Sequence, residues 1–222
     1  KKQNMNKKSL SVQIPRAEFK KSKFEKIYNT FRTKILKIVG KKSFVVAVSG
    51  GPDSLALAYF SKQYGKEFKN LIKYVIVDHN IRKNSDIEAK KVKKILNKEN
   101  MNLNILSWKD PVPKKNIQFN ARKIRYSLIL KYCLKYKIRY VLTAHHQDDQ
   151  IENFLIRLFR GSGIVGLSSM GEESQLIKKL KVVRPLLTIE KKHLKHVAKK
   201  TFGTYIKDPS NKNPIFLRTR IR

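Results

Sequence analysis

Short apolar runs alternate with longer amphipathic stretches along most of this 222-residue chain. Between the short runs, apolar residues at spacings of three and four predict helices that begin near Asp53, Ser85, Ile117, Gln147 and Glu190. The short runs themselves predict strands, because they are bounded by polar or glycine residues and rich in β-branched or aromatic ones. They are SFVVAVSG at 43–50, LIKYVIVDH at 71–79, LNILSW at 103–108, RYVLTAHH at 139–146 and KVVRPLL at 181–187.

The alternation of strand and helix indicates crossover units, in which successive strands lie parallel and helices cover both faces of the sheet. We therefore predict an α/β fold over residues 43–222, a doubly wound, mostly parallel five-stranded sheet. An amphipathic stretch at 17–39 predicts one more helix, within a basic N-terminal extension at 1–42. Ligands of such sheets bind at the carboxyl ends of the strands, so the candidate chemistry is expected there.

Composition narrows the class of protein. The chain carries 51 Lys and Arg against 16 Asp and Glu, a formal net charge of +35. Such an excess attracts polyanions such as nucleic acid, although a base-composition bias in the gene would also raise it. No run of about 18 apolar residues occurs, so no membrane span is predicted. The single cysteine, Cys133, excludes an internal disulfide or a four-cysteine metal site and favours a reducing compartment.

The first predicted strand runs into SGGPDS at 49–54. Gly50 and Gly51 can adopt backbone angles closed to other residues, and the following helix directs its positive end toward the turn. A loop of this kind can bind phosphate through its amides. The alternative is an ordinary strand-to-helix turn in which Asp53 or Ser54 caps the helix.

Two commoner nucleotide motifs fail in their sequence context. GKKS at 40–43 resembles the end of a P-loop, but the earlier glycine and the preceding strand are missing. Gly161, Gly163 and Gly166 match G-x-G-x-x-G, but they follow a predicted helix instead of a strand. We therefore expect these glycines to form the loop that ends that helix.

The SGGPDS segment resembles the signature of the ATP-pyrophosphatase (PP-loop) superfamily, whose members cleave ATP between its α and β phosphates to adenylate a substrate. Further segments, in this order, are similar to those of the tRNA(Ile)-lysidine synthase family, and the resemblance covers about residues 43–222. It implies an adenine nucleotide alpha hydrolase-like fold, and C-terminal tRNA-binding domains that these 222 residues do not include. The segments are VDHNIR at 77–82, ARKIRY at 121–126, AHHQDDQIEN at 144–153, RLFRGSGIVGL at 157–167, RPLL at 184–187, DPSN at 208–211 and RTRIR at 218–222.

This resemblance implies an ATP-dependent ligase that forms a carbon–nitrogen bond. ATP would adenylate C2 of the wobble cytidine in the isoleucine tRNA with anticodon CAU, and L-lysine would then displace AMP to give lysidine. The implied partners are that tRNA, L-lysine and ATP with Mg²⁺, with no membrane. The implied compartment is the cytoplasm, with an organelle of bacterial descent as the alternative, and a homodimer is one open possibility.

The resemblance also assigns residues to ATP. The turn would hold the pyrophosphate portion through Ser49, Gly50, Gly51, Pro52 and Ser54. Asp53 would repel phosphate directly, so we expect it to act through Mg²⁺, which takes carboxylate and phosphate oxygens together. Asp78 and His79 would recognise adenosine, although a polar strand end explains them equally well, and His145 is a further candidate for ATP binding.

Two pairs of residues are candidates for the chemistry itself. Arg122 and Arg125 share a helical face and would bind phosphate or the adenylated base, whereas without the resemblance a solvated face is the simpler interpretation. Asp149 and Glu152 also share a face, and could receive either the lysine ammonium or a second magnesium ion. A zinc site at 145–149 is not expected, because adjacent residues rarely converge on one ion.

Other members of the superfamily share the phosphate loop and differ in the nucleophile. A tRNA thiolase would need more cysteines than the one present. An amidating synthase would use ammonia or a glutaminase partner and would leave the basic excess unexplained. An inactive RNA-binding module of the same fold would gain nothing from carboxylates placed beside phosphate.

Overall fold

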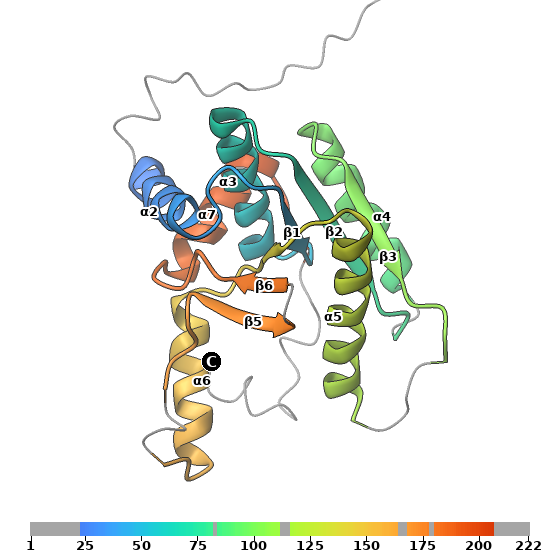
Figure 1. Ribbon diagram of the computed structural model, residues 1–222, viewed down its shortest axis with the longest axis vertical. Helices are drawn as coiled ribbons and strands as arrows, with labels where there is room; N and C mark the ends of the chain where they lie inside the picture. Colours follow the sequence, from blue (N-terminus) through green and yellow to red (C-terminus); the bar gives the residue numbers. More distant parts are fainter. Residues whose placement is uncertain (1–22, 82–83, 112–115, 164–167, 178–179, 207–222) are drawn as a thin grey trace, which may run out of the picture.

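A six-stranded sheet with the strand order β3-β2-β1-β4-β6-β5 forms the centre of the molecule (Figure 1). The structure, a computed structural model, describes residues 23–81, 84–111, 116–163, 168–177 and 180–206. The strands are β1 Phe44–Val48, β2 Ile72–Asp78, β3 Leu103–Ser107, β4 Tyr140–Leu142, β5 Glu173–Ile177 and β6 Leu180–Val183. The helices are α2 Lys23–Ile38, α3 Pro52–Phe68, α4 Ser85–Lys98, α5 Ile117–Lys135, α6 Gln147–Phe159 and α7 Lys191–Phe202.

The sheet is doubly wound, as predicted. From β1 the chain adds β2 and then β3 on one side, all parallel, and it crosses to the other side of β1 to add β4 and then β6, also parallel. The direction of winding therefore reverses between β1 and β4. A crevice opens at the carboxyl ends of two such strands, and this is where sheets of this kind bind their ligands.

All five predicted strands are confirmed, and the structure adds a sixth at the edge of the sheet. Strand β5 runs antiparallel to β6, and four of its five residues are exposed. Its sequence ESQLI has no apolar run and no alternation that points to a buried face. Pairing with β6, the strand that follows it closely in the chain, holds β5 in place although its own residues lack a strand pattern.

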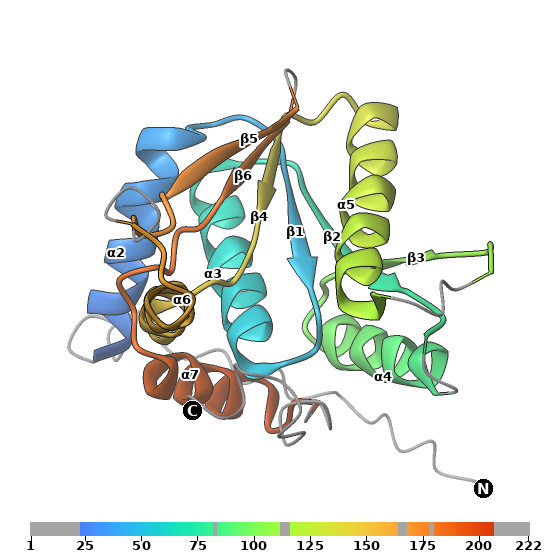
Figure 2. The ribbon, with the colours of Figure 1, turned by 90° about the horizontal axis from the view of Figure 1, so that it is seen from below.

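Helices cover both faces of the sheet (Figure 2). Buried residues of α2, α3, α4 and α7 pack in one core with the side chains on one face of the strands. Within that core, Phe31 of α2 lies between the rings of Phe60 and Tyr64 of α3, at centroid distances of 5.7 and 6.3 Å. Helix α2, the described part of the basic N-terminal segment, is thus packed onto α3.

Helix α5 covers the opposite face. Its residues Ile129 and Cys133 pack against Val45, Val75 and Val141 of three adjacent strands. Burial raises the pKa of the Cys133 thiol to about 12, so the thiol stays protonated at neutral pH and behaves as a small core side chain.

The helices after β1 begin within one residue of their predicted starts. Gly161 follows the end of α6 with a φ of 67°, which confirms the loop predicted for the glycines after that helix. Four predicted features lie wholly or partly outside the described residues, namely Arg82, the RLFRGSGIVGL segment with Gly166, DPSN and RTRIR. None of the described helices is long and apolar enough to span a membrane.

Candidate active site

The turn from β1 into α3 has a geometry that only glycine satisfies at its centre. Gly50 has a φ of 83°, and a Cβ atom placed on it would lie 2.4 Å from Cγ2 of Val92. Its carbonyl accepts a hydrogen bond of 2.9 Å from the backbone N–H of Ile206. The left-handed backbone and the close approach of α4 both exclude a side chain. The turn is thereby fixed between α4 and the segment that follows α7.

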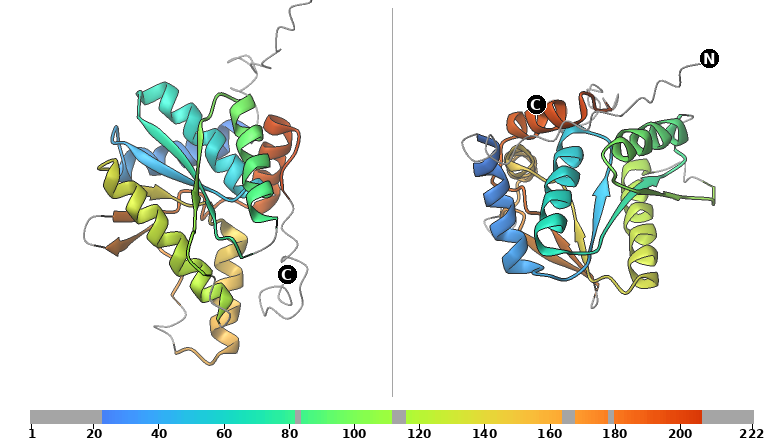
Figure 3. Two further views of the ribbon diagram at one scale, coloured as in Figure 1. Left: turned by 90° about the vertical axis from the view of Figure 1, so that its right-hand side faces the viewer. Right: turned by 90° about the horizontal axis from the view of Figure 1, so that it is seen from above.

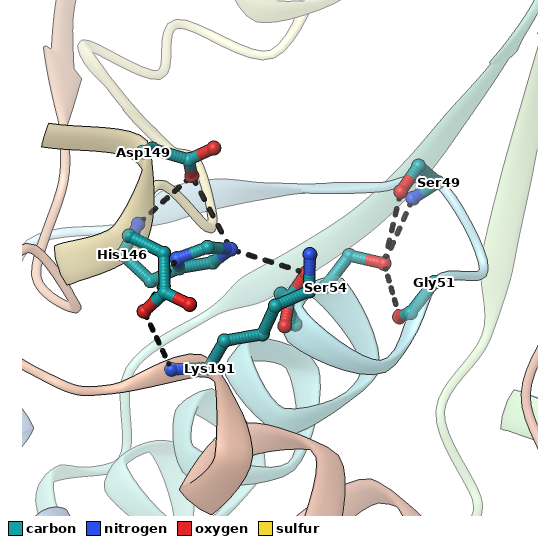
Figure 4. A network of polar contacts seen from close by, with 8 residues as sticks. Ser49, Gly51, Ser54, His146, Asp149 and Lys191 are labelled. Atoms are coloured by element: carbon teal, nitrogen blue, oxygen red, sulfur yellow. Dashed lines mark hydrogen bonds and ion pairs between the residues drawn. The ribbon is translucent and has the colours of Figure 1, made fainter. Parts of the chain in front are cut away.

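The buried hydroxyl of Ser54 forms hydrogen bonds with residues at both ends of this turn (Figure 4). Its Oγ accepts hydrogen bonds from the amide and the hydroxyl of Ser49, at 3.1 and 3.2 Å, and donates one of 2.9 Å to the carbonyl of Gly51. The N-cap of α3 is Gly51, which makes no side-chain capping bond. Neither Asp53 nor Ser54 is therefore the N-cap, and the first turn of α3 points its positive end into the crevice without a side-chain cap.

Carboxylates from α3 and α6 converge on the imidazole of His146, which is 2% exposed. Its Nε2 lies 3.5 Å from Oδ2 of Asp53 and 3.5 Å from Oδ2 of Asp149, and its Nδ1 lies 3.8 Å from Oδ1 of Asp148. Figure 4 shows His146 and Asp149 directed toward the turn that carries Ser49 and Ser54. The structure thus brings together Asp53 and Asp149, two candidates that lie almost a hundred residues apart in the sequence.

The sequence alone predicted no role for His146. Of the two adjacent histidines, His145 contacts Thr143, with Nδ1 3.0 Å from the hydroxyl, while His146 faces the carboxylates. The sequence did contain one local indication of the contact between His146 and Asp149. His146 directly precedes α6, and Asp149 follows it three residues later. That spacing allows a carboxylate to accept a hydrogen bond from the N-cap amide, and Oδ2 of Asp149 does so at 3.0 Å.

Asp53 has the surroundings expected of a cation ligand. Its Oδ1 is buried and accepts no hydrogen bond from the residues that the structure describes. Leaving a buried acceptor unsatisfied costs about 1–3 kcal/mol, which a bound cation would offset. Across the described ranges, no group of three or more His, Cys, Asp or Glu could hold a metal by itself. The site therefore fits a magnesium ion that shares its ligands with substrate phosphates, which is how Mg²⁺ commonly binds.

Asp149 and Glu152 are the buried residues of α6, at 8% and 6% exposure. They lie three residues apart on one face of the helix, and Asp149 lies beside the His146 ring. Burying carboxylates is costly unless cations or hydrogen bonds compensate their charge. Oδ2 of Asp149 receives part of this compensation from the amide and the ring of His146.

The end of β2 meets α5 on the other side of the crevice. Asp78 is 8% exposed, and its Oδ1 accepts a hydrogen bond of 3.0 Å from the amide of Asn80. The neighbouring His79 has its Nε2 3.3 Å from a guanidinium nitrogen of Arg125. The structure thus joins two candidates, His79 and Arg125, and assigns Asp78 a role in shaping the turn after β2.

Arg122 lies one turn before Tyr126 on α5, with its guanidinium carbon 5.1 Å from the centre of the tyrosine ring. Arg184, of the RPLL segment, is buried and donates hydrogen bonds to the carbonyl of Gly171 and the hydroxyl of Ser174, at 3.1 and 2.9 Å. Burial lowers the pKa of Arg184, and the charge of Arg122 adds to that effect while Tyr126 opposes it.

Residues 19–222 match the PP-loop domain family, and the chain belongs to that family. It is similar to the tRNA(Ile)-lysidine synthase of Orientia tsutsugamushi, with 39% identity over 177 residues that cover 80% of this chain and 40% of the relative. The corresponding enzyme of Rhodopseudomonas palustris is 38% identical over 182 residues, covering 81% of this chain and 52% of the relative. The chain spans about half the length of the curated relatives it matches.

Among solved structures, the fold is similar to that of the U34-tRNA thiolase NcsA from Methanococcus maripaludis, with a TM-score of 0.70. The two proteins are 20% identical, and the match covers 89% of this chain and 71% of the thiolase. At this level of identity the likeness concerns the fold. It agrees with a parallel sheet whose winding reverses beside the phosphate turn.

Proposed function

We propose that this chain carries out the adenylation and ligation reactions of a tRNA(Ile)-lysidine synthase. The observation that carries the proposal is the 35–39% identity to relatives of that name over 80–88% of the chain. The geometry is consistent with it, because the Gly50 turn, Asp53 and Asp149 lie together around His146 at the carboxyl end of β1. The reaction would take place in the cytoplasm, where tRNA, ATP and L-lysine are all available.

The reaction has two steps. The C2 oxygen of the wobble cytidine attacks the α phosphorus of ATP, and the bond to pyrophosphate breaks. The ε-amino group of L-lysine then attacks C2, the C2–oxygen bond breaks, and AMP leaves with that oxygen while the amine loses its protons to solvent or a base. Adenylation is needed because it turns a poor leaving group into a good one.

The turn of Ser49, Gly50, Gly51, Pro52 and Ser54 supplies the binding site for pyrophosphate. Its amides and the positive end of α3 oppose the negative charge that builds up as pyrophosphate leaves. Asp53, with its unsatisfied buried oxygen, would hold Mg²⁺ against the phosphates. The ion would neutralise phosphate charge and orient the triphosphate. Arg122 and Arg125 would contact the phosphate or the adenylated base from α5.

Asp149 and Glu152 would bind the lysine substrate. Their two buried carboxylates create a negative pocket next to the phosphate turn, and an ammonium group would neutralise it. Asp149 would be an alternative magnesium ligand, since it lies on the same imidazole nitrogen of His146 as Asp53, with both carboxylates 3.5 Å from that nitrogen. His79 and His145, at the ends of β2 and β4, would line the place of the adenosine.

The test is pyrophosphate release by the 222-residue chain, with tRNA and L-lysine added singly and together. We expect release to require the tRNA with anticodon CAU, and lysidine to form only when lysine is also present. A matched tRNA with anticodon UAU is the control, because it lacks the target cytidine. Formation of an amidated product from ammonia, with no lysidine formed from lysine, would contradict the proposal in favour of an amidating enzyme. RNA binding without any release would favour an inactive RNA-binding module.

A further inference from the structure

Two helices extend past the carboxyl edge of the sheet, on opposite sides of the candidate site. Figure 1 shows the N-terminal part of α5 and the C-terminal part of α6 both reaching below the strands, and Figure 2, which looks along α6, shows β1 between the two helices. The view in Figure 3 shows the same two helix ends furthest from the sheet. Each end carries a phenylalanine, Phe119 or Phe159, and both are 69% exposed, the highest value among the large hydrophobic side chains of the described residues.

On α5, Phe119 continues the face that packs against the sheet. Phe119, Arg122, Tyr126, Ile129 and Cys133 follow one another at spacings of three and four, so they form one stripe along the helix. The last two are buried against the strands. Arg122 and Phe119 extend this stripe beyond the edge of the sheet, and Phe119 therefore faces the side of the helix on which the site lies.

On α6, Phe159 continues the face that begins in the site. Asp149, Glu152, Ile156 and Phe159 also follow at spacings of three and four. Asp149 lies beside His146, Glu152 is buried as well, and the apolar residues carry the same face outward to the end of the helix. Phe159 is therefore the outer end of a stripe that starts at the candidate site, and Phe119 is the outer end of a stripe that starts where α5 packs against the sheet.

Basic side chains accompany both phenylalanines. Lys123 is exposed on α5, and α5 contains no Asp or Glu. Arg160 is exposed directly after Phe159. Exposed aromatic rings interleaved with cationic groups are the surface on which proteins bind unpaired nucleotides, since the rings stack on bases and the cations contact phosphates. A protein partner without an acidic surface would have few carboxylates to pair with these exposed basic side chains.

We propose that Phe119 and Phe159 are stacking platforms for the unpaired bases that flank the target nucleotide of an RNA loop. This inference rests on the proposed function. An enzyme that modifies one base of a loop must draw that base out of its stack, and the neighbouring bases then lose a stacking partner. The two rings lie where the flanking bases would leave the site. Each ring stacks on one flanking base in place of the target base that has been drawn out.

The other face of α6 provides a matched control. Ile151, Phe154 and Leu158 lie on the side opposite Glu152, and they are exposed by 55%, 44% and 48%. Phe154 is therefore an exposed phenylalanine on the same helix, directed away from the site. The substitutions F119S and F159S, alone and together, are to be compared with F154S and with the aromatic replacement F119W/F159W.

The experiment measures binding of an anticodon stem-loop RNA with 2-aminopurine next to the target cytidine. Losing a stacked ring weakens single-strand binding by about fivefold to more than a hundredfold, so we expect each single serine variant to lose about tenfold and the double variant more. Wild type and F119W/F159W should quench the 2-aminopurine fluorescence, and F119S/F159S should not. ATP affinity and thermal unfolding should be unchanged in all variants, and F154S should bind RNA as the wild type does.

Several results would overturn the inference. If wild type binds and modifies the RNA and F119S/F159S does so equally well, the inference fails while the proposed function stands. If the serine variants change the sedimentation behaviour of the protein and leave RNA affinity unaltered, the surface contacts a second copy instead. If the wild-type chain binds no RNA at all, the proposed function fails and the inference fails with it.

Discussion

Helices α3 and α6 both direct their first turns into the candidate site, but they are held in place by different interactions. Nine residues of α3 are buried, most of them apolar, and Leu55, Phe60 and Tyr64 are inaccessible to solvent. The buried residues of α6 are the carboxylates Asp149 and Glu152, while its large apolar residues are mostly exposed. The hydrophobic core therefore positions one half of the site, and the polar groups of the site position the other.

The two helices that carry the site therefore differ in what holds them in place, which is the hydrophobic core for α3 and polar contacts for α6. The phosphate turn and Asp53 are in place as soon as the core forms, because α3 packs against β1 and α7. Helix α6 is held by polar contacts, including bonds between the Gln150 side chain and the backbone of Met170 at 2.7 and 2.8 Å. Oδ1 of Asp148 adds a contact of 3.2 Å with the amide of Lys191. Cationic substrates should therefore stabilise α6 more than α3.

The largest expected effect is on stability, from truncating the core of α3. F60A would remove a fully buried ring that packs on Phe31 and cost about 3–5 kcal/mol of unfolding free energy. ATP turnover should fall in proportion to the unfolded fraction. Chemical denaturation measures the loss, and a cost below about 1 kcal/mol would contradict the assignment of α3 to the core.

The second effect is on chemistry without loss of folding. D53N keeps the size of the side chain and removes the charge that would hold Mg²⁺, so pyrophosphate release should fall by about a hundredfold, or about 2.7 kcal/mol in activation free energy. The thermal unfolding midpoint should stay within a few degrees of wild type. Full turnover by D53N would end the proposed role of Asp53.

The third effect concerns the pocket on α6. E152Q and D149N each remove one buried charge, and the affinity for L-lysine should fall about tenfold, or about 1.4 kcal/mol, with ATP affinity retained. Stability should fall in D149N, which loses the charge that contacts the amide and the ring of His146, and should change less in E152Q, because burying an amide costs less than burying a carboxylate. Equilibrium dialysis with labelled lysine measures the change. Unchanged lysine affinity in both variants, with a raised Mg²⁺ requirement, would instead assign these carboxylates to a second magnesium ion.

The smallest effect is expected on the outer face of α6. I151S replaces a side chain that is 55% exposed and points away from the carboxylates. We expect a change of less than about 0.5 kcal/mol in unfolding free energy and no change in lysine or ATP affinity. A loss comparable to that of F60A would show that α6, like α3, is anchored by apolar packing.

The same contrast explains what could be predicted from the sequence. The alternation of apolar runs with longer helical stretches was enough to predict the starts of α3, α4, α5, α6 and α7 within one residue, whereas the strands before Thr143 and Arg184 end four residues earlier than predicted. The glycine turn and the carboxylate pair could be singled out from local spacing, and their roles stay predictions. The role of His146 was missed, since it depends on Asp53, a residue brought near by the fold. Strand β5 was missed because its sequence ESQLI has neither an apolar run nor a clear alternation, although its partner β6 follows it closely in the chain.

The hydrogen bond between the Gly50 carbonyl and the amide of Ile206 has a mechanical consequence. It links the Gly50 turn, at the carboxyl end of β1, to the segment that follows α7. A force applied to the chain beyond Ile206 would therefore reach the turn through one backbone contact, with Val92 packed close to Gly50. The position of the segment after α7 and the conformation of the Gly50 turn are in this way mechanically linked.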